Sequence, residues 1–234
     1  YSFFLKNKFL LLVLLSALIV LIFTGSFIKK RVYKAENALA AGYVLFIMGM
    51  SGISLELILI YIFQISFGFI YNSIGLIIAF FMAGLPLGAF LFFKLISLKK
   101  NSGKFIAENL SLGIILLMVI LTISIPALSG TIIDSGISGE LLVLLLIGLS
   151  GFLTGGIFPC SVFIINLKKK DPGRVAAVSD ALDHLGGAAG ALFTGTFFVP
   201  LFGIKYTTII LVLFQLSAMI TLAGAKIGKS RNII

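Results

Sequence analysis

Long, predominantly apolar segments recur along this chain of 234 residues, and they restrict its fold more than any other feature. The hydrocarbon core of a bilayer is roughly 30 Å thick, so a helix needs about 20 apolar residues to cross it. Seven segments reach about that length. They run from Phe9 to Ile28, Ala38 to Gln64, Phe69 to Phe93, Phe105 to Leu128, Glu140 to Leu167, Val175 to Phe202 and Ile204 to Ala225.

The composition supports a membrane protein rather than a water-soluble one. Hydrophobic residues make up 60% of the chain and charged residues 11%, whereas soluble domains carry roughly 25% charged residues. The segments lack a period of two and far exceed the roughly 10 residues of a barrel strand, so they predict helices. We therefore expect an all-α, polytopic membrane protein of about seven transmembrane helices. Residues 1–37 form an N-terminal helix with a basic loop, and residues 38–234 form a six-helix membrane domain.

The net charge of +10 raises the question of nucleic-acid binding, but the positions of the charges indicate a different role. Assigning each lysine and arginine to a loop places 15 on one face of the membrane and 3 on the other. The positive-inside rule puts the basic loops in the cytoplasm, beside anionic lipid headgroups. This pattern predicts a multi-pass protein of the bacterial inner membrane with a cytoplasmic C-terminus and an outside N-terminus, in contact with lipid and not with nucleic acid.

Glycines spaced four residues apart occur in three of the predicted helices. The pairs are Gly84 with Gly88, Gly151 with Gly155, and Gly186 with Gly190. Lipid gives helices no hydrophobic drive to associate, so small residues at this spacing predict close helix packing. The alternative is that these glycines leave room for a ligand or form a hinge.

A weak internal similarity suggests that the six-helix domain is a repeat. The sequence GMSG at 49–52 returns as GLSG at 148–151, a difference of 99 residues. The sequence LGAF at 87–90 returns as AGALF at 189–193, a difference near 102. The charge pattern makes the two halves run in opposite directions, so this predicts an inverted three-plus-three repeat. Many transporters use such a repeat to build a site near the middle of the bilayer.

Several motifs resemble one membrane-protein family. They are GMSG and SLE at 49–56, FQ at 63–64 through Gly68 and Tyr71, FMAGLPLG at 81–88, GGIFP at 155–159, and SD at 179–180 through GGAAGA at 186–191 with VP at 199–200. Together they resemble the membrane portion of bacterial membrane-fused spermidine-synthase-like proteins, whose helices are distantly similar to half of a major facilitator transporter. The resemblance covers roughly residues 38–225.

The resemblance implies a partner domain of the Rossmann-type methyltransferase architecture, which uses decarboxylated S-adenosylmethionine to aminopropylate a polyamine. This chain has no soluble stretch of sufficient length, no glycine-rich loop after a strand and no acidic polyamine-binding pair in a cytoplasmic segment. We therefore assign it no aminopropyl transfer, no catalytic residue and no cofactor. Because the chain begins at Tyr1 rather than methionine, we expect an upstream domain or a partner subunit.

One ionisable residue, Glu56, lies inside a predicted helix among apolar neighbours. Charged side chains at this depth are costly and are functional candidates by default. The cost favours the neutral acid unless a cation pairs with it. Glu56 is expected about a turn from the outer end of its helix. It is interpreted either as a protonated carboxyl that donates a hydrogen bond to a neighbouring helix or as a site for a proton or cation.

A second candidate cluster consists of Asp180, Asp183 and His184, the only histidine. Their spacing of three and four residues predicts one helical face. The acids could simply complement the helix dipole and pair locally with His184 or nearby basic residues. The functional alternative is a cytoplasmic gate or proton relay. We predict no metal site, because two carboxylates and one histidine form a thin ligand set, and one histidine excludes a self-contained bis-histidine haem.

Other residues are weaker candidates. Gln64, Tyr71 and Asn72 flank a short uncharged turn, where they could line a mouth or lie among headgroups. Pro86 and Pro159 each remove a backbone hydrogen bond and are expected to kink their helices, which could mark discontinuous helices around a cavity.

Two main functions follow from these observations. In the first, the chain is a non-catalytic membrane module that anchors or positions a partner domain or subunit. In the second, it is a transporter-like protein that moves a polar or cationic solute, such as a polyamine or a proton. A membrane subunit of an electron-transfer complex is a third reading. Since seven helices form only about half of a major facilitator fold, we prefer the first function, and a homo-oligomer is the arrangement that would restore the second.

Overall fold

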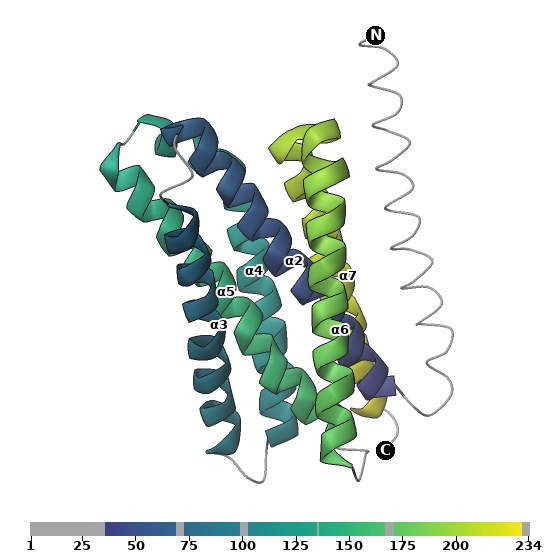
Figure 1. Cartoon of the computed structure of the whole chain (residues 1–234). Helices are drawn as coiled ribbons and strands as arrows, with labels where there is room; N and C mark the ends of the chain where they lie inside the picture. The colour runs from purple at the N-terminus through teal and green to yellow at the C-terminus, as the bar shows by residue number, and fades with distance from the viewer. Residues whose placement is uncertain (1–35, 69–72, 99–102, 135, 167–170, 231–234) are drawn as a thin grey trace, which may run out of the picture.

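The computed structural model describes residues 36–68, 73–98, 103–134, 136–166 and 171–230, and all its elements in these ranges are helical (Figure 1). The expected first helix, Phe9 to Ile28, lies outside the described residues. The elements are α2 (Glu36–Phe67), α3 (Ile74–Ser97), α4 (Gly103–Asp134), α5 (Ile137–Asn166), α6 (Pro172–Phe193), the π-helix η1 (Thr194–Phe198) and α7 (Val199–Ser230).

Five helices in the described ranges are long and apolar enough to cross a membrane. The fifth runs from Pro172 to Ala225, and its 54 residues would extend roughly 80 Å, well beyond the roughly 30 Å of hydrocarbon. Gly203 interrupts it with φ 72° and ψ 174°, a conformation that favours glycine. The chain reverses direction there, so α7 returns toward the end of the bundle at which α6 begins (Figure 1).

Residues with specific capping roles mark where helices begin and end. Gly68, with φ 79°, follows α2, and its N–H donates to the carbonyl of Gln64 at 3.0 Å. Asp171 caps α6 by accepting a hydrogen bond from the N–H of Arg174 at 3.2 Å, and Pro172 occupies the first turn.

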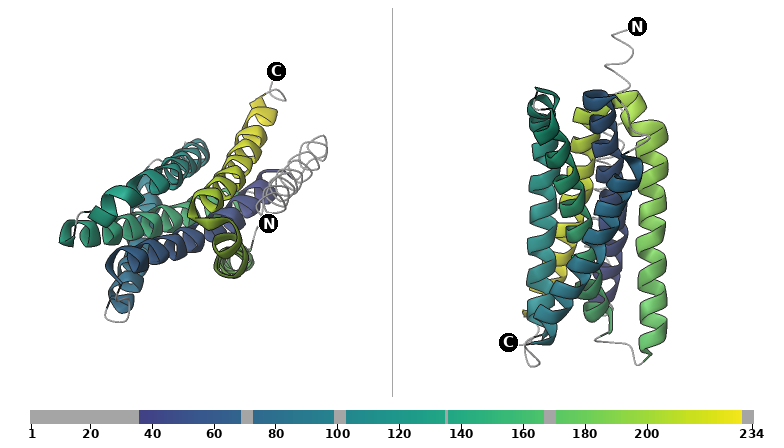
Figure 2. Two further views of the ribbon diagram at one scale, coloured as in Figure 1. Left: turned by 90° about the horizontal axis from the view of Figure 1, so that it is seen from above. Right: turned by 60° about the vertical axis from the view of Figure 1, so that its left-hand side comes forward.

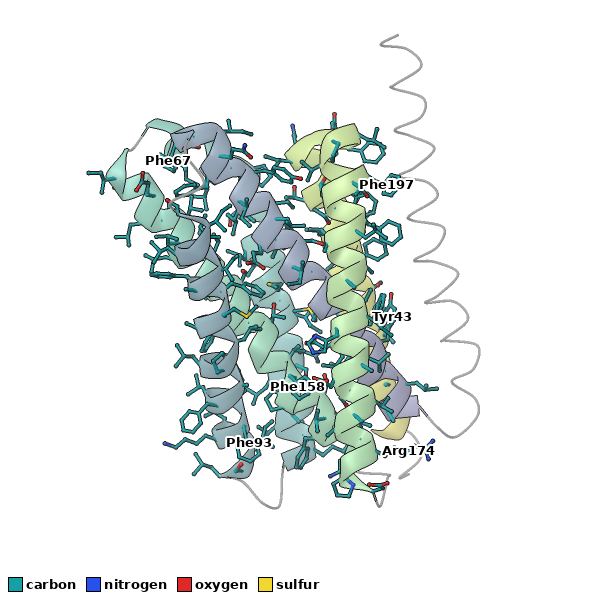
Figure 3. The ribbon with its side chains drawn as sticks, viewed as in Figure 1. Tyr43, Phe67, Phe93, Phe158, Arg174 and Phe197 are labelled. Atoms are coloured by element: carbon teal, nitrogen blue, oxygen red, sulfur yellow. The ribbon has the colours of Figure 1, made fainter. Side chains whose placement is uncertain are left out.

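Lysine and arginine are separated between the two ends of the bundle. Lys94, Lys104 and Arg174 lie at the end of α3 and the beginnings of α4 and α6, which meet at one end that we call the basic end. Figure 3 shows Phe93 and Arg174 at this end, and Phe67 and Phe197 at the other. Lys205 follows the turn at Gly203, opposite the basic end.

Helices α2 and α5 occupy the centre of the fold and run antiparallel. Helix α2 packs against α5, α6 and α7, whereas α5 packs against α2, α3 and α4, and α4 packs against α7. Helices α3 and α6 lie on either side of the crossing of α2 and α5 (Figures 1 and 2). Within the described residues α3 and α6 share no substantial contact with each other, so each packs separately on the central pair.

The packing of α3 on α5 brings two backbones into direct contact. A Cβ atom added to Gly84 would collide with the carbonyl oxygen of Gly148, and one added to Gly88 would collide with that of Phe152. Gly151 and Gly155 have equally little space on the side of α5. Only a missing side chain permits this approach, which replaces the hydrophobic drive that lipid does not supply.

The packing of α6 on α2 follows the same plan. A Cβ atom at Gly186 would collide with the carbonyl oxygen of Phe46, and one at Gly190 with that of Met50. In both pairs of helices the residue numbers of the contacting residues increase together. Helices α2 and α6 therefore run parallel, as do α3 and α5. The two outer helices are therefore fixed to the central pair by equivalent glycine contacts.

The two glycine interfaces correspond by a constant numerical difference. Gly186 follows Gly84 by 102 residues (186 − 84 = 102), and their contact partners Gly148 and Phe46 differ by the same amount (148 − 46 = 102). Gly52 and Thr154, which also differ by 102 residues, touch each other where α2 crosses α5. For α2 and α5 the contacts thus correspond at 102 residues, three more than the motif comparison of 49–52 with 148–151 predicts.

A buried polar pair joins α4 to α7. The Gln215 amide donates to the Thr122 hydroxyl oxygen at 3.0 Å, and the Thr122 hydroxyl also lies 2.7 Å from the carbonyl oxygen of Met118. Both residues are fully buried, at 0% exposure. Such a hydrogen bond between transmembrane helices contributes about 0.6–2 kcal/mol and fixes the register of α4 on α7.

Filling a glycine contact tests this packing. Gly84→Leu or Gly190→Leu should lower the free energy of unfolding by about 1–3 kcal/mol, because the outer helix must move away from the central pair. Unfolding in mixed micelles, followed by circular dichroism as the fraction of sodium dodecyl sulfate rises, measures the change. Gly113→Leu is the matched control, because a side chain there meets nothing within 4 Å. Equal losses for Gly113 and Gly84 variants would contradict the packing argument.

Candidate functional site

Glu56 lies within α2, eleven residues before the last residue, Phe67. At 1.5 Å per residue this is roughly 16 Å, or three turns, from the helix end, which is deeper than the single turn that the sequence predicts. Gly52 touches α5 and Ile53 touches α6. Because Glu56 follows them by four and three residues, its half-buried side chain lies on the strip of α2 between α5 and α6.

Asp183 lies against α2 at Gly49. A Cβ atom at Gly49 would lie 2.5 Å from the carbonyl oxygen of Asp183 and 2.7 Å from its Oδ1 atom. The missing side chain of Gly49 therefore makes the space that the carboxyl group occupies. The Oδ1 atom is buried and has no hydrogen-bond partner among the residues the structure describes.

A second buried oxygen without a partner lies one turn from Asp183. Ser179 precedes it by four residues on α6, is 0% exposed, and its hydroxyl oxygen has no hydrogen-bond partner within the described ranges. Both side chains lie on the side of α6 that packs against α2. Ser51, Ser66 and Ser161 are likewise without a partner among the described residues, so the Asp183 carboxyl group stands out by its acidity and not by lacking a hydrogen bond.

Asp180 and His184 point away from this interface. The His184 Nε2 atom lies 3.5 Å from an Asp180 carboxylate oxygen, and the two side chains are 77% and 63% exposed, respectively. The structure thus brings Asp180 and His184 together on the outside of α6 and separates both from Asp183, which faces α2. The spacing in the sequence predicts one shared face for all three, so α6 instead presents two polar surfaces.

Hydroxyl groups connect α2 to the elements around it. Thr194, in η1, donates to the Ser54 hydroxyl at 2.8 Å, and Tyr43 and Ser217 are joined at 2.7 Å between α2 and α7. Tyr61 donates to the carbonyl oxygen of Gly195 at 3.5 Å. A π-helical turn at such a position is often associated with function. The sequence analysis missed these contacts, because serine, threonine and tyrosine carry no periodic signal that identifies an interhelical partner.

Glu108 shows how this fold accommodates a buried acid that has a partner. It lies in the second turn of α4 at 6% exposure, and its carboxylate is 3.3 Å from the ammonium group of Lys104. Glu56 and Asp183 have no ion pair with lysine or arginine among the described side chains. They therefore differ from Glu108 in charge compensation.

The remaining predicted residues lie away from this interface. Gln64 is exposed in the last turn of α2, and Tyr71 and Asn72 lie outside the described residues. Helices α3 and α5 continue through Pro86 and Pro159. The part of the chain that the structure describes contains no group of three or more His, Cys, Asp and Glu side chains that could hold a metal ion.

Comparison with known proteins adds no relative to this description. No family model, curated protein or solved structure matches the chain. The resemblance to spermidine-synthase-like membrane proteins therefore stays a prediction from the sequence motifs.

Chemical labelling tests whether the two inner acids are neutral. A hydrophobic carbodiimide reacts with protonated carboxyl groups in apolar surroundings, so we expect adducts on Glu56 and Asp183, because burying an unpaired carboxylate costs several kcal/mol. Mass spectrometry of peptides locates each adduct, and Glu56→Gln and Asp183→Asn should each remove one. Glu140, exposed in the first turn of α5, is the matched control and should react only with a water-soluble carbodiimide. Labelling of Glu140 alone by both reagents would contradict the expectation.

Proposed function

We propose that this chain is a membrane module of the transporter type, in which Glu56 and Asp183 bind a proton or a small cationic solute. The observation that carries the proposal is the pair of acidic side chains inside the bundle, on α2 and α6, that have no basic partner among the described side chains. Intramembrane carboxyl groups of this kind are typical of ion pathways and proton relays.

The positions of these acids suit binding and release. Gly49 holds Asp183 at the α2–α6 interface, and Glu56 lies two turns further along the same strip of α2. This strip lies between α5 and α6, and the Glu56 side chain on it is only half-buried. A cation would compensate the carboxylates there and would give the Asp183 Oδ1 atom the partner that it lacks among the described residues. Polyamines and protons both fit this chemistry.

The contacts also support an inverted repeat of α2–α4 and α5–α7. A two-fold axis in the membrane plane, passing close to Gly52 and Thr154, would exchange the α3–α5 and α6–α2 interfaces with a constant difference of 102 residues. Under this relation Glu56 corresponds to Phe158, which Figure 3 shows between α3 and α6. Asp183 corresponds in the same way to Phe81, so each half of the repeat would carry one acid whose counterpart in the other half is a phenylalanine. Together with the apolar segment at Phe9 to Ile28, the proposed topology has seven crossings.

The charge distribution supports an orientation in the membrane. Lys94, Lys104 and Arg174 mark the basic end, and only Lys205 lies opposite among the described basic side chains. The positive-inside rule then places the basic end and the C-terminus in the cytoplasm of a bacterial cell, with the N-terminus outside.

A non-catalytic module that positions a partner is the second candidate. The observation that favours it is the number of exposed large apolar side chains on α3, such as Met82, Leu87 and Phe90, on which a subunit or a domain of a larger assembly would dock. The motif resemblance to membrane-fused spermidine-synthase-like proteins points to the same role. In that case Glu56 and Asp183 would serve only packing.

Cysteine labelling tests the orientation. Cys160 is the single cysteine of the sequence and is first replaced by serine. In this Cys160→Ser background, Lys94→Cys should react with a membrane-impermeant maleimide only from the cytoplasmic side, and Lys205→Cys only from outside, because the two positions lie at opposite ends of the bundle. Intact cells and inverted membrane vesicles provide the two sides. Reaction of both cysteines from one side would contradict the proposed topology.

Transport assays separate the two functions. Proteoliposomes with the wild-type chain should take up a radiolabelled polyamine or carry a proton flux, and Glu56→Gln or Asp183→Asn should lower the rate by about ten-fold, since each removes one charged contact worth about 1.4 kcal/mol. Glu140→Gln should leave the rate unchanged. Absence of both polyamine uptake and proton flux with the wild-type chain would remove the transporter function and leave the positioning role.

A further inference from the structure

The outer side of α6 differs from a typical lipid-facing helix surface. Beside exposed large side chains such as Leu185 and Leu192, it carries a strip of exposed small residues, namely Ala177, Ala181, Ala188 and Ala191. By contrast, the exposed surface of α4 consists of large apolar side chains, namely Leu116, Leu117, Ile120 and Ile123. Small residues on the outside of a transmembrane helix allow the backbone of another helix to approach closely.

The Asp180–His184 pair lies in the middle of this alanine strip. Asp180 and His184 follow the first residue of α6, Pro172, by eight and twelve residues, which is roughly 12 and 18 Å along the helix. At that depth an acid and an imidazole that are 63% and 77% exposed would face hydrocarbon, which is costly. The two groups pair with each other at 3.5 Å, but their exposed sides would still face hydrocarbon, and a polar partner at this height would remove that cost.

We infer that the partner is a second copy of this chain, which docks α6 against its own α6 about a two-fold axis along the membrane normal. In this arrangement Asp180 of each copy meets His184 of the partner subunit, and the alanines let the helices pack closely. A two-fold contact of this kind is self-complementary and closed. The inference rests on the membrane placement of α6 that the proposed function uses, and it adds a subunit contact on the outside of α6, away from the Asp183 interface.

Charge complementarity favours a second copy over other occupants of the strip. Each copy offers one acid and one base, one helical turn apart. Two identical surfaces can therefore form two equivalent acid–base contacts, one from each copy to the other. The chain's own segment from Phe9 to Ile28 contains no charged residue and has nothing to complement the pair. The exposed side chains in the middle of α3, such as Ile78 and Met82, are also uncharged. Lipid tails offer no polar group at that depth.

Cross-linking in native membranes tests the contact. In the Cys160→Ser background, Ala188→Cys and Ala181→Cys should form disulfide-linked dimers under mild oxidation, at least about five-fold more than Leu117→Cys on the lipid-facing side of α4. Dimer yield on a non-reducing gel is the readout. If the α6 cysteines give no more dimer than Leu117→Cys, the inference is wrong, whether the strip faces lipid or another segment of the chain.

A charge exchange tests the polar pair within the dimer. His184→Asp places two acids on each copy and should lower the dimer yield of Ala188→Cys at least about five-fold, whereas the double variant Asp180→His with His184→Asp restores one acid and one base per copy and should recover it. Equal yields from all three chains would overturn the reciprocal contact. Because the readout is assembly, failure of this inference is distinguishable from loss of transport in proteoliposomes.

Discussion

Backbone contact between glycines and carbonyl groups is the constraint on which the rest of this structure depends. Lipid tails are as apolar as leucine, so helices in a bilayer associate through close packing and polar contacts. Gly84, Gly88, Gly186 and Gly190 allow α3 and α6 to approach the central pair until a single added carbon would collide with a carbonyl oxygen. The contact of Asp183 with Gly49 depends on the same close approach, because α6 comes this near to α2 only where small residues face each other.

The close packing also encloses acidic side chains, which are costly to bury without a positively charged partner. Glu108 has Lys104 beside it, whereas Asp183 occupies a space made by Gly49 and has an oxygen without a partner among the described residues. A well-packed interface could have held a leucine at position 183 if stability alone were at issue, since unpaired polar groups in apolar surroundings reduce stability. The proposed role, in which Asp183 binds and releases a positive charge, would account for this energetic cost.

Sequence patterns predict much of this fold and less of the site. The described helices lie close to their predicted ranges, because an apolar run of about 20 residues reflects the thickness of the bilayer, and the break at Gly203 falls between two predicted segments. The separation of Asp183 from Asp180 and His184 was not predicted, because helical periodicity gives angles around an axis but not which neighbour occupies each side. The Thr122–Gln215 pair, 93 residues apart, depends on tertiary register in the same way.

Helix α6 links the interface inside one chain to the proposed contact between two chains. It carries Asp183, which faces α2, and the Asp180–His184 pair of the proposed subunit contact within about one turn. Any movement of α6 relative to α2 that opened the space at Gly49 would also displace the alanine strip and the Asp180–His184 pair. In a two-fold dimer the two α6 helices would then have to shift together or exchange their polar contacts. Binding of a cation to Asp183 in one copy would thereby affect the position of α6 in the other copy. The close contacts that glycine allows toward α2, and alanine toward the partner subunit, would transmit the movement.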